Sequence, residues 1–234
     1  MSETAATQQL TLITHALLVG LTPLIPLPLA DDLAKQFLQQ RMVRSLARTH
    51  GVTIDEKDLP GMLSVLPAKK GCLSGCLLSA IAYPLKKLAR KIFFFLEIKR
   101  AVDLTSYTYH YGYLLDYAMR EGWFAKRGLK EIDAALDDIC LAAPIKPVEA
   151  AIRATFQQSK RLLLLPVSLV EAQLTRIGGE PTPEQVAEGL RAAKSDENQQ
   201  ALNSLAARLQ NALAAVPDEH FTKLRETFVA RLNG

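Results

Sequence analysis

The sequence predicts an all-α protein, a multi-helix bundle with apolar core helices and a polar C-terminal helical appendage. Leu and Ala are abundant and aromatic residues make up only 6% of the chain, a composition that favours helices over strands. Apolar residues recur at helical spacing through most segments. The 234 residues, 49% of them hydrophobic, are enough to bury a substantial core.

The opening segment, residues 4–30, contains no Asp, Glu, Lys or Arg. Pro23, Pro26 and Pro28 prevent a regular helix through its second half, because each proline lacks an N–H and clashes one turn back. A membrane span needs about 20 helical apolar residues, and only about half that length remains. A secretion signal has positively charged residues before its apolar segment, whereas here the residues before it include Glu3 and no Lys or Arg. We expect a short buried or interfacial helix that ends in a Pro-rich elbow and is neither cleaved nor membrane-spanning.

The next predicted helix runs from Asp31-Asp32 to about His50. Either acid can cap its start, and Gly51 suits the residue after its end. One side of this helix is apolar and the other is basic. Thr53-Ile-Asp-Glu56 fits a capping box and predicts a further short helix, interrupted at Pro60-Gly61.

Residues 71–85 are uncharged, and Pro84 is expected to divide this region into two helical pieces. A basic cluster follows at i, i+1, i+4 and i+5, a spacing that a helix places within one broad face. Its members are Lys86, Lys87, Arg90 and Lys91. Phe93, Phe94 and Phe95 come next, which favours contact with anionic lipid over nucleic-acid phosphate. An ordinary solvated basic face is an alternative of similar weight.

A tyrosine-rich segment covers residues 105–119. Tyrosines at alternate positions from 107 to 113 would suit a strand. Tyr109, Tyr113 and Tyr117, however, recur every four residues among helical neighbours, so we predict a helix. The simpler interpretation is a seam between helices or an aromatic belt at a membrane surface. The alternative is a ligand pocket, with Tyr107, His110, Tyr111 and Tyr117 as its candidate lining.

The later helices are expected at residues 129–139, from 147 to Gly178-Gly179 with a bend at Pro166, and at 197–215 and 218–232. The acids of the first, Glu131, Asp133, Asp137 and Asp138, are interpreted as a solvated face. Thr182-Pro-Glu-Gln185 is a second capping box. The last helices are more polar than those before Gly178. This shift divides the chain into an apolar helical core domain, 1–178, and a polar helical appendage, 179–234.

No enzyme motif is found in the chain. Its four histidines, His15, His50, His110 and His220, are scattered and lack a nearby nucleophile motif. Cys72 and Cys76 are one helical turn apart and could hold zinc with His110 or Cys140, but tight packing of small residues is the preferred explanation. We therefore predict no catalytic residue, no metal and no cofactor, and the sequence favours a non-enzymatic protein without deciding the question.

The elbow Pro23-Leu-Ile-Pro-Leu-Pro-Leu-Ala-Asp31-Asp32 enters a helix that contains Arg41-Met-Val-Arg44-Ser-Leu-Ala-Arg-Thr-His-Gly51. This order resembles a group of poorly characterised bacterial helical domains found beside small GTPases and in membrane-associated proteins. The resemblance covers about the first fifty residues, with a weaker echo at 105–113. It implies a helical, membrane-proximal accessory protein with a small GTPase as a candidate partner. It carries over no catalytic residue, and the chain has no P-loop motif.

The leading expectation is a non-enzymatic, membrane-associated helical scaffold or regulatory protein, cytoplasmic and peripheral to the inner membrane. The 71–85 segment and the Phe cluster would enter the membrane interface while the four basic residues contact anionic headgroups. A net charge of +4 is too mild to indicate nucleic acid. One alternative is a soluble module that binds a GTPase or a secretion or motility assembly. Another is a lipid- or small-molecule-binding protein, or an enzyme, that uses the tyrosine pocket.

Overall fold

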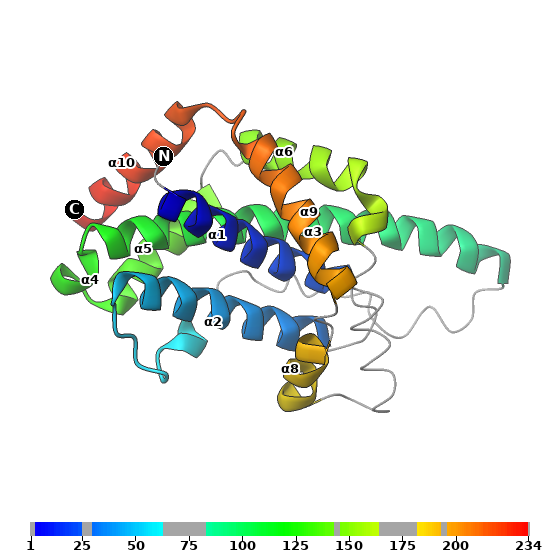
Figure 1. The fold of residues 1–234 in the computed structure, drawn as a ribbon, viewed down its shortest axis with the longest axis horizontal. Coiled ribbons are helices and arrows are strands. Elements are labelled where there is room, and N and C mark those ends of the chain that lie inside the picture. The colour runs from blue at the N-terminus through cyan, green and yellow to red at the C-terminus, as the bar shows by residue number, and fades with distance from the viewer. Residues whose placement is uncertain are drawn as a thin grey trace.

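The structure is a computed structural model, which describes residues 3–24, 30–62, 83–142, 146–163, 182–192 and 196–233. The described residues form α-helices and two short 3₁₀ turns, Thr22–Leu24 and Leu59–Gly61, with no strand among them (Figure 1). This confirms the predicted all-α multi-helix bundle. The helices are α1 (Glu3–Leu21), α2 (Ala30–His50), α3 (Tyr83–Arg120), α4 (Trp123–Lys126), α5 (Leu129–Ala142), α6 (Lys146–Gln158), α8 (Pro183–Ala192), α9 (Asp196–Leu213) and α10 (Asp218–Asn233).

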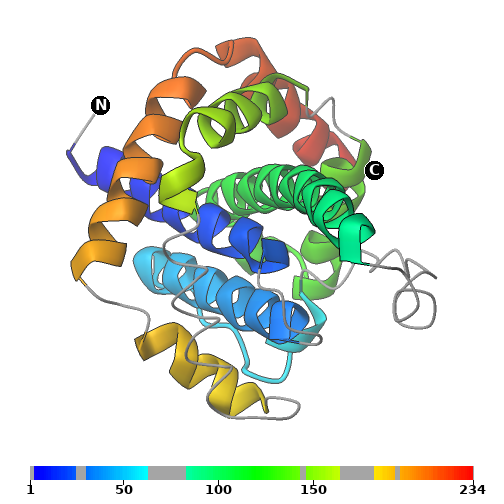
Figure 2. The same ribbon diagram turned by 90° about the vertical axis from the view of Figure 1, so that its right-hand side faces the viewer.

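Helix α1 occupies the middle of the bundle. It packs against α2, α3 and α9 (Figure 2), so it has apolar neighbours on several sides. A helix with neighbours on several sides buries much of its circumference, which favours uncharged residues there, although Thr7 and Leu10 of α1 stay exposed. Its buried side chains include Leu12, Ile13, Ala16, Leu17 and Leu21. Within the described ranges, no helix combines the length and the apolar character that crossing a membrane requires.

Two glycines allow α1 and α3 to approach closely. A Cβ atom on Gly20 would overlap Oγ1 of Thr105 and would lie 2.9 Å from the carbonyl oxygen of Ala101. On α3, a Cβ atom on Gly112 would overlap the Leu12 side chain and lie 3.1 Å from Sδ of Met42. Packing at this density leaves no room for an added methyl group.

The predicted end of α2 is confirmed, but its predicted start is not. The helix ends at His50, and Gly51 takes the left-handed conformation with φ +64°, which glycine adopts without steric cost. The helix begins at Ala30, so Asp31 and Asp32 lie in its first turn, after the N-cap position that was predicted for them. Asp32 pairs with Lys35 at 2.7 Å, and acids in a first turn still favour the positive end of the helix dipole.

The short helix predicted from the Thr53–Glu56 capping box is wrong. Residues 53–55 are irregular, and only the 3₁₀ turn Leu59–Gly61 follows them. Glu56 reaches α2, where its carboxylate accepts hydrogen bonds from the Arg44 guanidinium at 2.6 and 3.1 Å. The acid that a capping box would have used thus binds another element.

Helix α3 is continuous over 38 residues, and it confirms the helical interpretation of the tyrosine segment. Pro84 is its second residue, a position where proline's missing N–H costs nothing. The predicted piece before Pro84 lies outside the described residues. From Ala101 onward α3 contributes many side chains to the core, whereas its N-terminal part extends past the other described helices (Figure 1).

The polar C-terminal helices lie where the sequence predicts them, and the second capping box forms. Thr182 N–H donates to Oε1 of Gln185 at 2.9 Å, and Gln185 N–H donates to Oγ1 of Thr182 at 3.4 Å. The apolar side chains of α9 and α10 join the same hydrophobic cluster as α1, α3 and α5. The predicted boundary near residue 178, like the bend at Pro166, lies outside the described residues, so the division into 1–178 and 179–234 stays a prediction.

Candidate functional site

The predicted lipid-contact residues all lie on the extending part of α3. They are Lys86, Lys87, Arg90, Lys91, Phe93 and Phe94. Their backbone is helical, and their side chains lie outside the described part of the structure. The first described side chain after them is Leu96, which is 52% exposed. Lys99 and Arg100, one turn further on, are also exposed. The basic and apolar character predicted for residues 86–95 therefore continues into side chains that the structure places at the surface.

The four residues predicted to line one pocket face different neighbours. Tyr107 and Tyr111 reach α5, while His110 reaches α10. Tyr117 is half-buried, and its ring centre lies 6.3 Å from that of Phe228. The structure brings Tyr107 and Tyr111 together, with ring centres 6.2 Å apart, as part of a helix seam.

Each of these two tyrosines donates a hydrogen bond to an acid on α5. Tyr107 binds Oδ1 of Asp137, and Tyr111 binds Oδ1 of Asp133 at 2.5 Å. Two hydroxyls four residues apart on α3 thus meet two carboxylates four residues apart on α5, in opposite order, as antiparallel helices require. Asp137 is only 3% exposed. The interpretation of Asp133 and Asp137 as a solvated face is therefore wrong, whereas Asp138 is exposed as expected.

Burial controls the protonation of the Tyr107–Asp137 pair. It raises the pKa of Asp137 from 3.8 to about 6, against the opposing effect of the Tyr107 hydrogen bond and with a contribution from the nearby Asp133 and Asp138 carboxylates. Burial, assisted by Asp137, also raises the pKa of Tyr107 well above its ordinary value. At neutral pH the phenol stays protonated and donates a hydrogen bond to the carboxylate. This arrangement satisfies a buried acid and joins two helices.

On the other side of α3, His110 and His220 form a buried pair. Nδ1 of His110 lies 2.7 Å from the Ser106 carbonyl oxygen, and its Nε2 lies 3.0 Å from Nε2 of His220. Burial lowers the pKa of His110 to about 4 and also lowers the pKa of His220. Both rings are therefore neutral at pH 7, and each has one hydrogen-bearing nitrogen.

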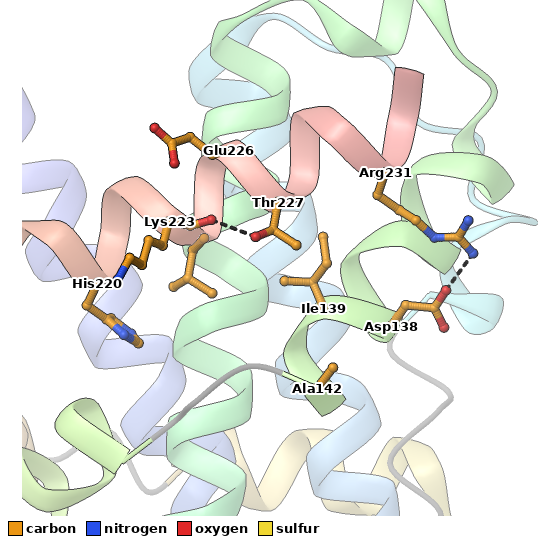
Figure 3. A pocket seen from close by; sticks show the side chains of 9 residues that line it. Asp138, Ile139, Ala142, His220, Lys223, Glu226, Thr227 and Arg231 are labelled. Atoms are coloured by element: carbon orange, nitrogen blue, oxygen red, sulfur yellow. Dashed lines mark hydrogen bonds and ion pairs between the residues drawn. The ribbon is translucent and has the colours of Figure 1, made fainter. Parts of the chain in front are cut away.

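His220 also lines a pocket of about 510 Å³ between α5 and α10. Figure 3 shows His220 at one end and the Asp138–Arg231 ion pair at the other, with its nitrogen and oxygen 2.8 Å apart. Further lining comes from the apolar side chains of Ile139, Ala142 and Leu224 and from the polar side chains of Lys223, Glu226 and Thr227. The sequence did not predict this pocket, because α5 and α10 are about 90 residues apart in the chain.

A third polar cluster joins the first three helices. Nε2 of His50 lies 2.8 Å from Oδ1 of Asp116, and Gln8 contacts both side chains. The sequence placed His50 at the end of α2, and this position is confirmed. Its link to Asp116 on α3 was not foreseen, because the two residues are 66 positions apart.

The candidate zinc ligands Cys72 and Cys76 lie outside the described residues. Cys140 is buried, and burial raises the pKa of its thiol far above the ordinary value, so this thiol is unreactive at neutral pH. In the part of the chain that the structure describes, no three His, Cys, Asp or Glu side chains are grouped so that they could hold a metal ion.

The fold defines the class of this protein as an all-α multi-helix bundle. Comparison of the chain with protein-family models, with curated proteins and with solved structures found no match. The resemblance of the first fifty residues to helical domains found beside small GTPases therefore stays a prediction.

Proposed function

We propose that this protein is a non-enzymatic, membrane-associated helical scaffold or regulatory protein, cytoplasmic and peripheral to the inner membrane. The observation that carries the proposal is the shape of α3. Its C-terminal part is anchored in the core, while its N-terminal part extends past the other described helices (Figure 1). The extending part contains the basic cluster and the Phe cluster of the sequence.

Two physical terms would act together at this helix. Basic residues near an anionic surface contribute roughly 1 kcal/mol each, and insertion of apolar side chains adds to that. The charged term weakens with salt, whereas the apolar term does not. The exposed Leu96 and Lys99 continue this combination of apolar and basic side chains along α3 toward the bundle.

The arrangement of the perturbed polar groups supports a non-enzymatic function. Tyr107 and Asp137 bind each other, and His110 binds Ser106 and His220. His110 and Asp137 are also enclosed, with 0% and 3% of their surfaces exposed. Groups that are satisfied within the fold stabilise it and are poorly placed to act on a substrate.

The test is flotation with vesicles. We expect the protein to float with anionic liposomes at low salt, and less so as salt rises. Changing Lys86, Lys87, Arg90 and Lys91 together to Glu should weaken vesicle binding about a thousandfold, since four residues at roughly 1 kcal/mol each give roughly 4 kcal/mol. Helical circular dichroism should not change.

A matched control reverses the charge of four exposed basic residues outside α3. Changing Lys130, Lys146, Lys160 and Arg161 to Glu alters the net charge equally, and we expect this variant to float with at least a tenth of the wild-type affinity. Equal loss in both variants would show that net charge alone drives binding. If the unchanged protein stays with the soluble fraction at low salt, the membrane proposal fails, and a soluble module that binds a protein partner replaces it.

A further inference from the structure

At the pocket between α5 and α10, the contacts of His110 determine which ring nitrogens of His110 and His220 donate hydrogen bonds and which accept them. A carbonyl oxygen can only accept, so the short contact to Ser106 places the proton of neutral His110 on Nδ1. Its Nε2 must then accept, and the 3.0 Å contact requires that His220 donates from Nε2. The proton of neutral His220 is therefore on Nε2, and its Nδ1 carries a lone pair.

That lone pair belongs to the most enclosed polar side chain of the lining. His220 is 8% exposed, whereas Asp138, Lys223, Glu226, Thr227 and Arg231 are all exposed at the rim. Among the described residues, the structure gives no hydrogen-bond partner to Nδ1 of His220. Four of these five rim residues have partners: Arg231 binds Asp138 and Thr227 donates to the Lys223 carbonyl, as Figure 3 shows, and the Lys223 ammonium binds Glu219.

The remaining wall determines the rest of the ligand. Ile139, Ala142 and Leu224 give the pocket an apolar side. Its volume of about 510 Å³ is within the range of pockets that bind small organic molecules. A carboxylate would bring its own lone pairs against Nδ1, whereas a hydroxyl can donate to it.

We propose that this pocket binds an uncharged apolar molecule with one phenol or alcohol hydroxyl, which donates its hydrogen bond to Nδ1 of His220. The apolar body of the ligand lies against Ile139 and Leu224. This ligand site is independent of the proposed membrane surface on α3.

Three probes of similar size test the proposal: 4-butylphenol, its methyl ether 4-butylanisole, and 4-butylbenzoate. Titration calorimetry at pH 7 should show saturable binding of the phenol. We expect at least tenfold weaker binding of the ether and of the benzoate, because a site built around an acceptor discriminates against molecules without a donor. Long-range ¹H–¹⁵N spectra should show a shift at Nδ1 of His220 when the phenol binds.

Variants locate the site. His220→Phe should reduce phenol affinity to that of the ether, with ether affinity unchanged. Because His220→Phe also removes the partner of His110, the exposed Ala142 offers a second route: Ala142→Trp should fill the pocket and abolish binding of both molecules. Glu226→Gln, at the rim, should bind as the unchanged protein does. Equal affinity for phenol and ether, tighter binding of the benzoate, absence of saturable phenol binding, or undiminished binding by Ala142→Trp would each overturn the proposal.

Discussion

Replacing Gly20 with alanine is expected to lower the free energy of unfolding by about 3 kcal/mol or more, which places it at the upper end of the overpacking range. The added Cβ would overlap Oγ1 of Thr105 and would lie 2.8 Å from the Thr105 Cβ and 2.9 Å from the Ala101 carbonyl oxygen. Two of these atoms are rigidly attached to α3, so the helices must move apart. Alanine favours a helix over glycine by about 1 kcal/mol, which offsets only part of the loss. Urea denaturation followed by circular dichroism measures the change.

Two further variants make this prediction specific to the crossing of α1 and α3. Gly128→Ala places a Cβ where no atom lies within 4 Å, and we expect a change below about 1 kcal/mol. Adding Thr105→Ala to Gly20→Ala removes the Oγ1 overlap and should restore part of the loss. An unchanged urea midpoint in Gly20→Ala would mean that the two helices do not approach as closely as described.

Removing the Tyr107 hydroxyl is expected to destabilise the protein by about 3 kcal/mol at pH 7 and by about 1 kcal/mol at pH 5. At pH 7 Tyr107→Phe leaves the ionised Asp137 carboxylate buried without its donor, and hydrogen bonds to charged groups contribute more than neutral ones. At pH 5 Asp137, with a pKa of about 6, is mostly protonated, so removing its hydrogen-bond donor lowers the stability of the protein by less. Tyr113→Phe is the control, since no hydrogen bond of its hydroxyl is found within the described ranges. A loss that is equal at the two pH values would contradict a carboxylate acceptor.

Asp137 itself should make stability fall as pH rises. Its pKa is higher in the folded protein than the ordinary 3.8, so between about pH 4 and 6 the folded state holds a proton that the unfolded chain has released. The contribution of this group is fully present below pH 4 and declines through pH 6, by up to about 3 kcal/mol. His110 acts in the opposite direction, because its lowered pKa removes stability as pH falls from 6.5 to 4. Asp137→Asn should therefore gain stability over the unchanged protein as pH rises from 4 to 7, and unfolding measured across this range checks it.

Local signals predicted where most of the helices lie and several of their ends, although α1, at 19 residues, is about twice as long as predicted. Gly51 and the Thr182–Gln185 box act within a few residues, and both form as expected. The Thr53–Glu56 box failed because Arg44, twelve positions away from Glu56, competes for its carboxylate. Whether a local signal succeeds thus depends on whether a distant partner offers a stronger interaction.

The candidate site was harder to predict, because its groups are paired across helices. The spacing of Tyr107 with Tyr111 and of Asp133 with Asp137 was visible in the sequence, but no local rule matches one pair to the other. The i, i+4 repeat of acids at the edge of the α5 apolar stripe was the available signal. Likewise, nothing near His110 in the chain indicates His220, which is 110 residues away.

The central position of α1 also sets an order of events during synthesis of the chain. Gly20 and its contact residue Ala101 are about 80 residues apart, so at ~5–20 residues per second an interval of roughly 4 to 16 s separates their synthesis. Throughout that interval α1, which carries the core residues Ile13 and Leu17, lacks the α3 surface that later covers it. Contacts between residues so distant in sequence also slow folding, since a long loop must close before they form. The nascent chain therefore presents a hydrophobic helix to chaperones well before its own core can enclose it.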